Sequence, residues 1–159
     1  MTLQIREADF DDALDRAGIV DVLNSYASDP VGGGKALSED VCERLVPALR
    51  EHGNALVLLA FAGDRPVGMA ICFMGISTFQ ARPLLNIHDL AVVPDYRGKG
   101  IGRALLAAAE KQAVSRGCCK LTLEVREDNL PARNLYERYG FIDFVVGKPV
   151  PTRFLSKPL

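Results

Sequence analysis

The chain has 159 residues, of which 48% are apolar and 25% are charged, and its net charge is −1. These values are typical of a globular protein with one domain, residues 1–159, and they exclude a disordered or fibrous chain. The near-zero charge gives no reason to expect nucleic acid or a membrane surface as a partner, and no apolar run approaches the roughly 18 residues of a membrane span. The N-terminus lacks the pattern of a signal peptide, so we expect a cytoplasmic location.

The chain begins with a predicted strand and helix. Residues 3–8 alternate apolar and polar side chains, as a short strand does. Apolar residues at helical spacing then mark a helix: Ile19, Leu23 and Tyr26. Residues 28–36, which contain three consecutive glycines, predict a loop.

A second helix and a hairpin complete the first half. Ser38 fits the N-cap of a helix that we expect to end near Gly53, with Pro47 causing a kink or an early end. Residues 55–78 then predict a hairpin of two buried strands around a turn at 63–66.

The second half alternates strands and helices more regularly. Residues 86–93 predict a strand, and the next helix ends at Gly117 after a buried face formed by Ile101, Ala104, Leu105 and Ala108. Residues 120–125 predict another strand, residues 131–140 a short helix, and residues 141–159 two further strands. The strand–helix–strand unit predicts two parallel strands, so the fold class is α/β with a mixed sheet.

The cysteines and histidines do not indicate a metal site. The four cysteines, Cys42, Cys72, Cys118 and Cys119, lack metal-ligand spacing, and His52 and His88 are the only histidines. Adjacent cysteines rarely pair with each other. We therefore expect reduced, mostly buried thiols and no metal.

Three glycines, Gly98, Gly100 and Gly102, stand where a predicted strand gives way to a predicted helix. Basic side chains flank them: Arg97, Lys99 and Arg103. The first N–H groups of a helix lack partners and the helix dipole is positive there, so bare backbone at this point predicts a site for phosphate or pyrophosphate. The alternative is a tight glycine turn before an ordinary helix.

The glycine spacing excludes two common phosphate loops. Residues 32–36, "GGGKA", lack the Ser or Thr of a Walker loop, and the last glycine of a Rossmann fingerprint would fall on Arg103. The spacing present is Arg-x-x-Gly-x-Gly, from Arg97 to Gly102.

This spacing resembles the pyrophosphate loop of the GNAT superfamily, the acetyl-CoA-dependent N-acetyltransferases. "NIHDLAVVPDYRGKGIGRALL" is similar to the family's whole strand–loop–helix motif, and "KLTLEVREDNLPARNLYERYGF" to its second signature, N-x-x-A-x-x-L-Y-x-x-x-G-F. Locally the pattern also resembles ribosomal-protein N-terminal acetyltransferases. The resemblance implies a mixed, mostly antiparallel sheet with a splayed central strand pair and helices on both faces.

The resemblance also implies positions for the coenzyme. The pyrophosphate of acetyl-CoA would be held by six consecutive backbone amides of a loop that begins at Arg97. These amides belong to Gly98, Lys99, Gly100, Ile101, Gly102 and Arg103. A bulged, splayed strand would pair with the pantetheine arm through Leu90, Ala91 and Val92. Asn129 matches a residue near the bound thioester, and Tyr136 matches the tyrosine that protonates the departing thiolate.

The acceptor side is less defined. Glu124 matches a glutamate proposed as general base, and the alternative for it is a structural carboxylate. His88 has the intrinsically better pKa for a base, but a bulge prevents alternation from deciding whether His88 or Asp89 faces the cleft. Two segments could contact the acceptor: residues 29–37 and residues 77–85, the latter through Phe79 and Arg82.

Two functions remain open at this point. The first is an acyltransferase that moves the acetyl group of acetyl-CoA to a primary amine of a small molecule or a protein, by direct attack in a ternary complex. The second is a non-catalytic module that binds acetyl-CoA as a sensor or regulator. The sequence does not identify the acceptor amine, and it leaves a homodimer open.

Overall fold

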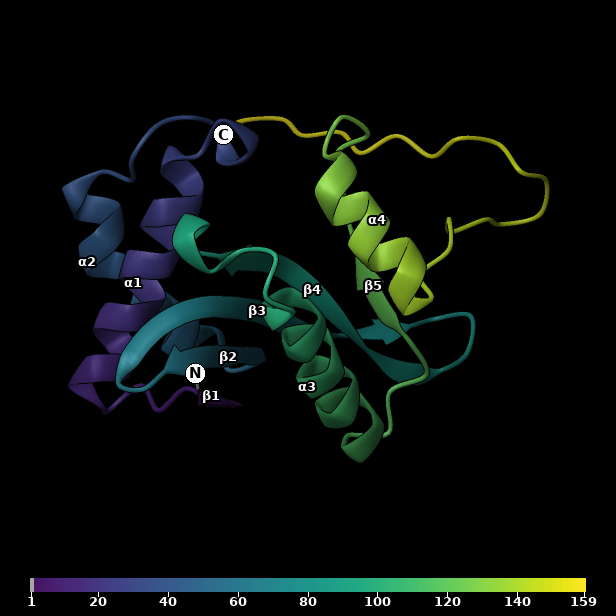
Figure 1. The fold of residues 1–159 in the computed structure, drawn as a ribbon. Helices are drawn as coiled ribbons and strands as arrows, with labels where there is room; N and C mark the ends of the chain where they lie inside the picture. The colour runs from purple at the N-terminus through teal and green to yellow at the C-terminus, as the bar shows by residue number, and fades with distance from the viewer. Residues whose placement is uncertain (1) are drawn as a thin grey trace.

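The computed structural model describes residues 2–159 and contains a five-stranded sheet with helices on both faces (Figure 1). The strands are β1 (Leu3–Glu7), β2 (Ala55–Ala62), β3 (Arg65–Ser77), β4 (Arg82–Val92) and β5 (Leu121–Leu123). The α-helices are α1 (Ala13–Ser28), α2 (Glu39–His52), α3 (Ile101–Ser115) and α4 (Leu130–Tyr139). Two short 3₁₀ helices are η1 (Pro30–Gly32) and η2 (Pro94–Tyr96).

The strand order in the sheet is β1-β2-β3-β4-β5. The first four strands pair antiparallel, whereas β4 and β5 pair parallel, with α3 as the crossover between them. This confirms the predicted parallel unit and the predicted mixed, mostly antiparallel sheet.

Each face of the sheet has its own apolar core. Helices α1 and α2 cover one face, where Ile19, Val22 and Leu49 pack against Leu59 and Ile71. Helices α3 and α4 cover the other, where the buried residues include Leu105, Leu106 and Ala109 of α3 and Tyr136 of α4, together with Leu85 of β4. No helix among residues 2–159 combines the length and apolarity that crossing a membrane requires.

Helix α2 confirms its predicted ends but not an early stop at proline. The Ser38 hydroxyl accepts a hydrogen bond from the Val41 N–H at 3.3 Å, and Gly53 closes the helix at a φ of +73°. Pro47 lies inside the helix, which continues to His52. Because Pro47 is exposed, water can reach the Glu43 carbonyl that the proline leaves without a backbone donor.

The central strands are longer than the pattern predicted. The turn between β2 and β3 consists of Gly63 and Asp64, so the expected turn at 63–66 is too wide. Strand β3 extends to Ser77 and β4 begins at Arg82, four residues before the expected start. The residues added to β4 pair along β3, which explains why they are extended despite Pro83.

The two strands expected within residues 141–159 are wrong. These residues contain no strand or helix. Gly147 has a φ of +73°, and Pro149, Pro151 and Pro158 lack the N–H that a ladder needs. Large apolar side chains of this segment are exposed: Ile142, Phe144, Val145, Val146, Val150, Phe154, Leu155 and Leu159. In Figure 1 the segment is an irregular trace that leaves the end of α4. We call residues 142–159 the C-terminal segment.

Candidate active site

Strands β4 and β5 pair over three residues in the middle of β4 and then separate. Ile71 of β3 lies opposite Asp89 and Cys72 lies opposite Ile87, so His88 is the extra residue of a bulge in β4. Parallel pairing joins residues 85–87 of β4 to residues 121–123 of β5, and it ends there. Beyond the bulge, the backbone of β4 is therefore not paired with β5, although the Val92 carbonyl accepts a hydrogen bond from Arg97. This confirms the splayed strand pair.

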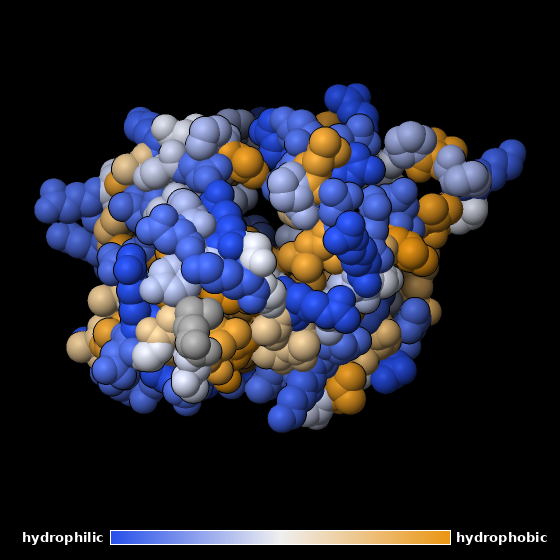
Figure 2. Space-filling view, viewed as in Figure 1, coloured by the Kyte–Doolittle hydropathy of each residue, from blue (hydrophilic) through white to orange (hydrophobic). Residues whose placement is uncertain are grey.

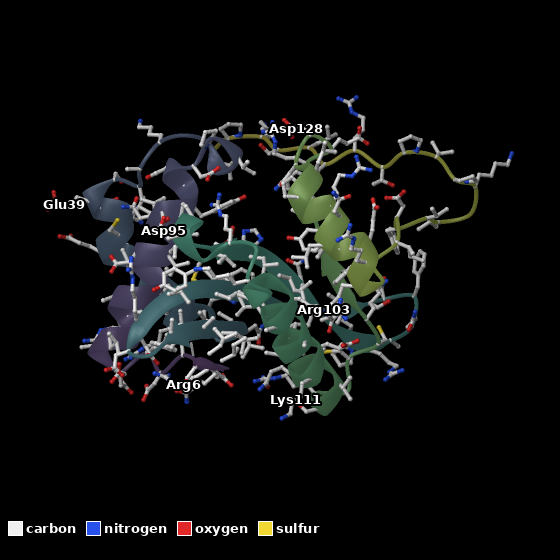
Figure 3. The ribbon with its side chains drawn as sticks, in the orientation of Figure 1. Arg6, Glu39, Asp95, Arg103, Lys111 and Asp128 are labelled. Carbon is white, nitrogen blue, oxygen red and sulfur yellow. The ribbon has the colours of Figure 1, made fainter. Side chains whose placement is uncertain are left out.

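A hollow lies on the surface above this splay. Figure 2 shows it between the part of the molecule that contains α1 and η2 and the part that contains α4. Asp95 on η2 and Asp128 just before α4 mark these two sides in Figure 3. The open end of the splayed strands thus leads toward the surface, next to the glycine loop.

The glycine loop presents bare backbone N–H groups. Gly98 and Gly100 have φ values of +73° and +81°, and a side chain added at either would meet no atom within 4 Å. Gly100 is the N-cap of α3 and supplies no side-chain cap. Among residues 2–159, no N–H group from Gly98 to Arg103 donates to a backbone carbonyl, and the first such bond of α3 joins the Ala104 N–H to the Gly100 carbonyl. A row of unpaired donors at the positive end of a helix is suited to an anion.

Gly102 has a different role. A Cβ added at this position would lie 3.0 Å from Cδ2 of Leu135 in α4, so the glycine lets α3 and α4 approach closely. Its N–H group belongs to the unpaired row, but its lack of a side chain serves packing between helices.

The basic side chains of the loop contact the protein itself. The Arg97 guanidinium donates to the Val92 carbonyl at 3.0 Å and to the Asp29 carboxylate at 2.9 Å. Lys99 donates to the Asp95 carbonyl at 2.9 Å. Arg103 lies over the Tyr139 ring, 5.7 Å from its centroid. The anion site is therefore formed by backbone, and Arg97 braces the loop against the segment between α1 and α2.

Tyr136 projects from α4 into the core beside the splay. It is 9% exposed and its ring packs edge-on against Phe141. Within residues 2–159, no protein group hydrogen-bonds the Tyr136 hydroxyl. Every fully enclosed side-chain oxygen among these residues has a hydrogen-bond partner, so a hydroxyl without one is not fully enclosed and reaches the surface. Burial, with a smaller effect of Tyr26, raises the pKa of Tyr136 to about 12. The hydroxyl therefore stays protonated at neutral pH.

Tyr26 and Asp89 face the same region from the other side of the sheet. Burial raises the pKa of Tyr26, and the charges of Asp89 and Asp29 raise it further. Burial also raises the pKa of Asp89, while a charged His88 acts in the opposite direction. Sequence reasoning used Tyr26 only to mark a helix and could not orient Asp89, because the bulge that turns it is invisible in the pattern of residues.

The remaining predicted site residues differ in exposure, and His88 and Glu124 are at the surface. His88 is exposed and its ring packs edge-on against Phe73, with centroids 5.4 Å apart. Glu124 is exposed just after β5. The Asn129 side chain accepts a hydrogen bond from the Ala132 N–H at 3.3 Å and is the N-cap of α4. Leu90, Ala91 and Val92 lie on the splayed part of β4, as predicted.

The segment at 77–85 does not reach this region. Phe79 lies in the turn between β3 and β4 and is 86% exposed, and Arg82 donates to the Gly117 carbonyl at 3.2 Å. Both residues are at the end of β4 remote from the glycine loop. The other expected acceptor segment, residues 29–37, is joined to the loop by the Asp29–Arg97 ion pair.

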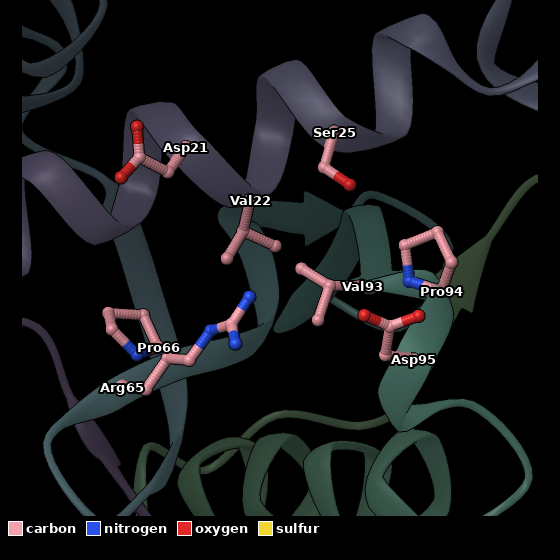
Figure 4. Close-up of a pocket in the computed structure, with 8 residues that line it drawn as sticks. All are labelled: Asp21, Val22, Ser25, Arg65, Pro66, Val93, Pro94 and Asp95. Carbon is pink, nitrogen blue, oxygen red and sulfur yellow. The ribbon is translucent and has the colours of Figure 1, made fainter.

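A separate pocket of about 340 Å³ lies between α1 and η2 (Figure 4). Its lining residues come from α1, the start of β3, and the end of the β4–η2 connection with η2: Asp21, Val22, Ser25, Arg65, Pro66, Val93, Pro94 and Asp95. None of these residues belongs to the splay or to the glycine loop.

Among residues 2–159, no group of three His, Cys, Asp or Glu side chains could hold a metal ion. All four cysteines are free, as expected. Only Cys72 is buried, so the expectation of mostly buried thiols is wrong.

Comparison with known proteins identifies the family. The profile of the Acetyltransferase (GNAT) family matches residues 19–141. The chain belongs to the GNAT acetyltransferase family. This GNAT chain is 31% identical over 145 residues to the uncharacterized N-acetyltransferase YhfO of Bacillus subtilis, an alignment that covers 87% of the chain and 89% of that protein. Its relatives are named N-acetyltransferases, and it is an acyltransferase of that class.

Solved structures share the GNAT fold. A transcriptional regulator from Bacillus halodurans superimposes with a TM-score of 0.77 at 25% identity, covering 95% of this chain and all (100%) of that one. A ribosomal-protein-alanine N-acetyltransferase from Brucella melitensis superimposes with a TM-score of 0.73 at 20% identity, over 95% of this chain and 100% of its own. The second likeness concerns the fold alone.

Proposed function

We propose that residues 1–159 act as one domain that transfers the acetyl group of acetyl-CoA to a primary amine, of a small molecule or a protein, by direct attack in a ternary complex. The observation that carries this proposal is the row of unpaired N–H groups from Gly98 to Arg103 beside the splayed end of β4. A cytoplasmic location and a homodimer stay predictions.

The residues present fit acetyl-CoA, the acetyl donor of the family. Gly98 and Gly100 leave space where side chains would stand, so a pyrophosphate can approach the loop N–H groups. The part of β4 that carries Leu90, Ala91 and Val92 offers backbone groups that β5 does not use, and these suit the amides of a pantetheine arm. Asn129 caps α4 at the edge of the same region.

Acetyl-CoA supplies an activated thioester, so the protein has to orient the carbonyl, bind a neutral amine and assist departure of the sulfur. A backbone N–H of splayed β4 is suited to bind the developing oxyanion. Tyr136 is suited to act as the general acid, because its hydroxyl is protonated, lacks a protein partner and reaches the surface next to the splay. Glu124 and His88, both at the surface, are candidates for the proton acceptor.

Gly100→Val tests the coenzyme site. The valine would occupy the approach of the phosphate, and we expect calorimetry to show loss of acetyl-CoA binding by at least about 10²-fold, equivalent to roughly 3 kcal/mol. Gly117→Val is the matched control, since Gly117 also has a positive φ, +71°, with no atom near the added Cβ, but lies at the far end of α3. Unchanged affinity in folded Gly100→Val would contradict the proposed site.

Release of free thiol from acetyl-CoA across a panel of primary amines tests the reaction. We expect thiol release that depends on one class of amine. Tight coenzyme binding without release for any amine would favour the sensor or regulatory module instead.

A further inference from the structure

The inference rests on the proposed function and concerns the acceptor amine. We infer that the Asp89 carboxylate binds the ammonium group of the acceptor and takes its proton. Asp89 would therefore be a catalytic residue, in place of the exposed candidates Glu124 and His88.

The bulge in β4 determines where Asp89 points. Ala91, two residues further along the strand, packs in the core under α1 and α2, whereas Leu90 and Val92 pack against the core under α3 and α4. Because side chains alternate along a strand, Asp89 shares the face of Ala91. It thus lies on the α1 side of the sheet, two residues beyond Ile87, the last residue of β4 that pairs with β5.

Within residues 2–159 the Asp89 carboxylate has no ion-pair partner within 4 Å and no hydrogen-bond donor, and the only charge that lowers its pKa is that of the neighbouring His88. No side chain or backbone group hydrogen-bonds its carboxylate, and because no fully enclosed oxygen lacks a partner, its oxygens reach the surface. Other partly or fully buried aspartates are compensated: Asp15 by Arg6, and Asp29 by Arg97 and the Val31 N–H. A half-buried carboxylate without a partner is suited to a cation that arrives with the ligand.

The groups around Asp89 include other ionisable side chains, and none of them hydrogen-bonds its carboxylate. Tyr26 faces Asp89 from α1, whereas Cys72 of β3 packs in the core on the other face of the sheet. Burial and the Asp89 charge raise the pKa values of both, that of Cys72 to about 12. Arg126 is the one cation that influences Tyr26. Burial raises the pKa of Asp89 itself, which makes it a stronger base than an exposed carboxylate.

The proposed step balances without another reactant. The acceptor enters as R–NH₃⁺, one N–H bond breaks, and the proton forms an O–H bond with Asp89. The neutral amine then forms a C–N bond with the acetyl carbon while the C–S bond breaks, and the sulfur takes a proton from the Tyr136 side. The second proton of the amine leaves to water with that of Asp89 as the site resets, and Tyr136 regains a proton from water.

An exposed base contributes little to deprotonation of the acceptor, because solvent can remove the same proton. Glu124 and His88 are both exposed, so water and buffer can perform the same proton transfer beside them. Asp89 differs because it is half-buried and can bind the ammonium group before deprotonating it.

The test is the pH dependence of kcat/KM for acetyl transfer, in wild type and in Asp89→Asn. We expect Asp89→Asn to lower kcat/KM by about 10²-fold at pH 7 and to remove the acidic limb of the profile, with unchanged acetyl-CoA affinity by calorimetry. Asp89→Glu, which keeps a carboxylate, should retain the limb. Asp64→Asn makes the same change in the exposed β2–β3 turn and should alter neither quantity.

A second acceptor separates proton transfer from structural damage. With an amine of low pKa that is already neutral at the assay pH, the defect of Asp89→Asn should shrink at least tenfold, whereas a misfolded site would show the same defect with every amine. Two outcomes would overturn the inference and leave the proposed acetyltransferase function standing. In the first, the acidic limb persists in Asp89→Asn. In the second, it is lost in Glu124→Gln or His88→Gln instead. Absence of transfer by the wild type would overturn the proposed function itself.

Discussion

The Tyr136 hydroxyl combines a buried ring with an accessible oxygen. Its pKa of about 12 keeps it protonated, but a thiol has an ordinary pKa near 8.5, so complete proton transfer to the sulfur is uphill. The hydroxyl should therefore first stabilise the departing sulfur through a hydrogen bond that strengthens as charge develops there, and its proton passes to the sulfur as Tyr136 regains one from water. Such a donor works best in a site that water does not fill.

We expect Tyr136→Phe to lower the single-turnover rate of acetyl transfer by about 10²-fold and to leave acetyl-CoA affinity nearly unchanged. Tyr139→Phe is the control. Tyr139 lies on the same helix, but its hydroxyl donates a hydrogen bond to the Glu110 carboxylate at 2.6 Å, away from the splay. Equal single-turnover rates for wild type and Tyr136→Phe would return Tyr136 to a packing role.

The sequence predicted some features of the candidate site and not others. The glycine loop could be predicted because spacing and helix position together specify bare N–H groups. The orientation of Asp89 could not, because one inserted residue at His88 shifts the alternation that would have decided it. The bracing of Arg97 by Asp29 joins residues 68 positions apart, and no local pattern indicates such a contact.

At the scale of elements, a buried ion pair attaches α1 to β1. Both oxygens of Asp15 accept from Arg6, at 2.5 and 2.7 Å, and Asp15 also accepts from the Asp9 N–H. Asp15 is 0% exposed and Arg6 is 38% exposed in their side chains. The hydrogen bond from Arg6 lowers the pKa of Asp15, although burial opposes it. The pair therefore stabilises the fold above the unfolded pKa near 3.9 and ceases to do so as pH falls through the lower folded value.

We expect Asp15→Asn to lower the free energy of unfolding at pH 7 by about 3 kcal/mol, the low end for breaking a buried pair because Arg6 is partly exposed. Urea unfolding at pH 7 and at pH 3 measures this, and the gap between wild type and variant should narrow at the lower pH. Asp40→Asn, in the exposed pair with Arg44, is the control and should change stability little. An equal gap at both pH values would contradict the role of the ionised pair.

The elements themselves were largely predictable from apolar periodicity and caps. Helix α2 begins just after Ser38 and ends just before Gly53, because these two cap residues satisfy its terminal groups. Periodicity failed in the C-terminal segment, where β-branched and aromatic residues suggested strands. A segment with high strand propensity becomes a strand only when it can pair with the edge of a sheet. In the C-terminal segment the prolines lack the N–H groups that such pairing needs, and Gly147 has a positive φ.

At the scale of the whole molecule, the C-terminal segment leaves a large apolar surface uncovered. Phe154 is 78% exposed and Leu155 is 74% exposed, close to one another in sequence. Large apolar side chains that are exposed next to one another in sequence favour association. A second copy of the chain presents the same surface and is the occupant that we propose.

We expect the protein to be dimeric by light scattering at micromolar concentration, and the double substitution Phe154→Ser with Leu155→Ser to weaken the dimer by at least about tenfold. Val114→Ser is the control, since Val114 is 72% exposed on α3, outside the segment. A monomer at every concentration would show that these side chains do not mediate self-association.

The Arg97–Asp29 ion pair has a consequence for the order in which substrates bind. It ties the loop that would hold the coenzyme to the segment between α1 and α2 that borders the acceptor side. An occupant that fixes one segment reduces the conformational freedom of the other, so the second ligand has less entropy to lose. Thermodynamic linkage makes this effect reciprocal: if coenzyme raises the affinity for the amine, the amine raises the affinity for coenzyme by the same factor. The two substrates would then bind with positive cooperativity.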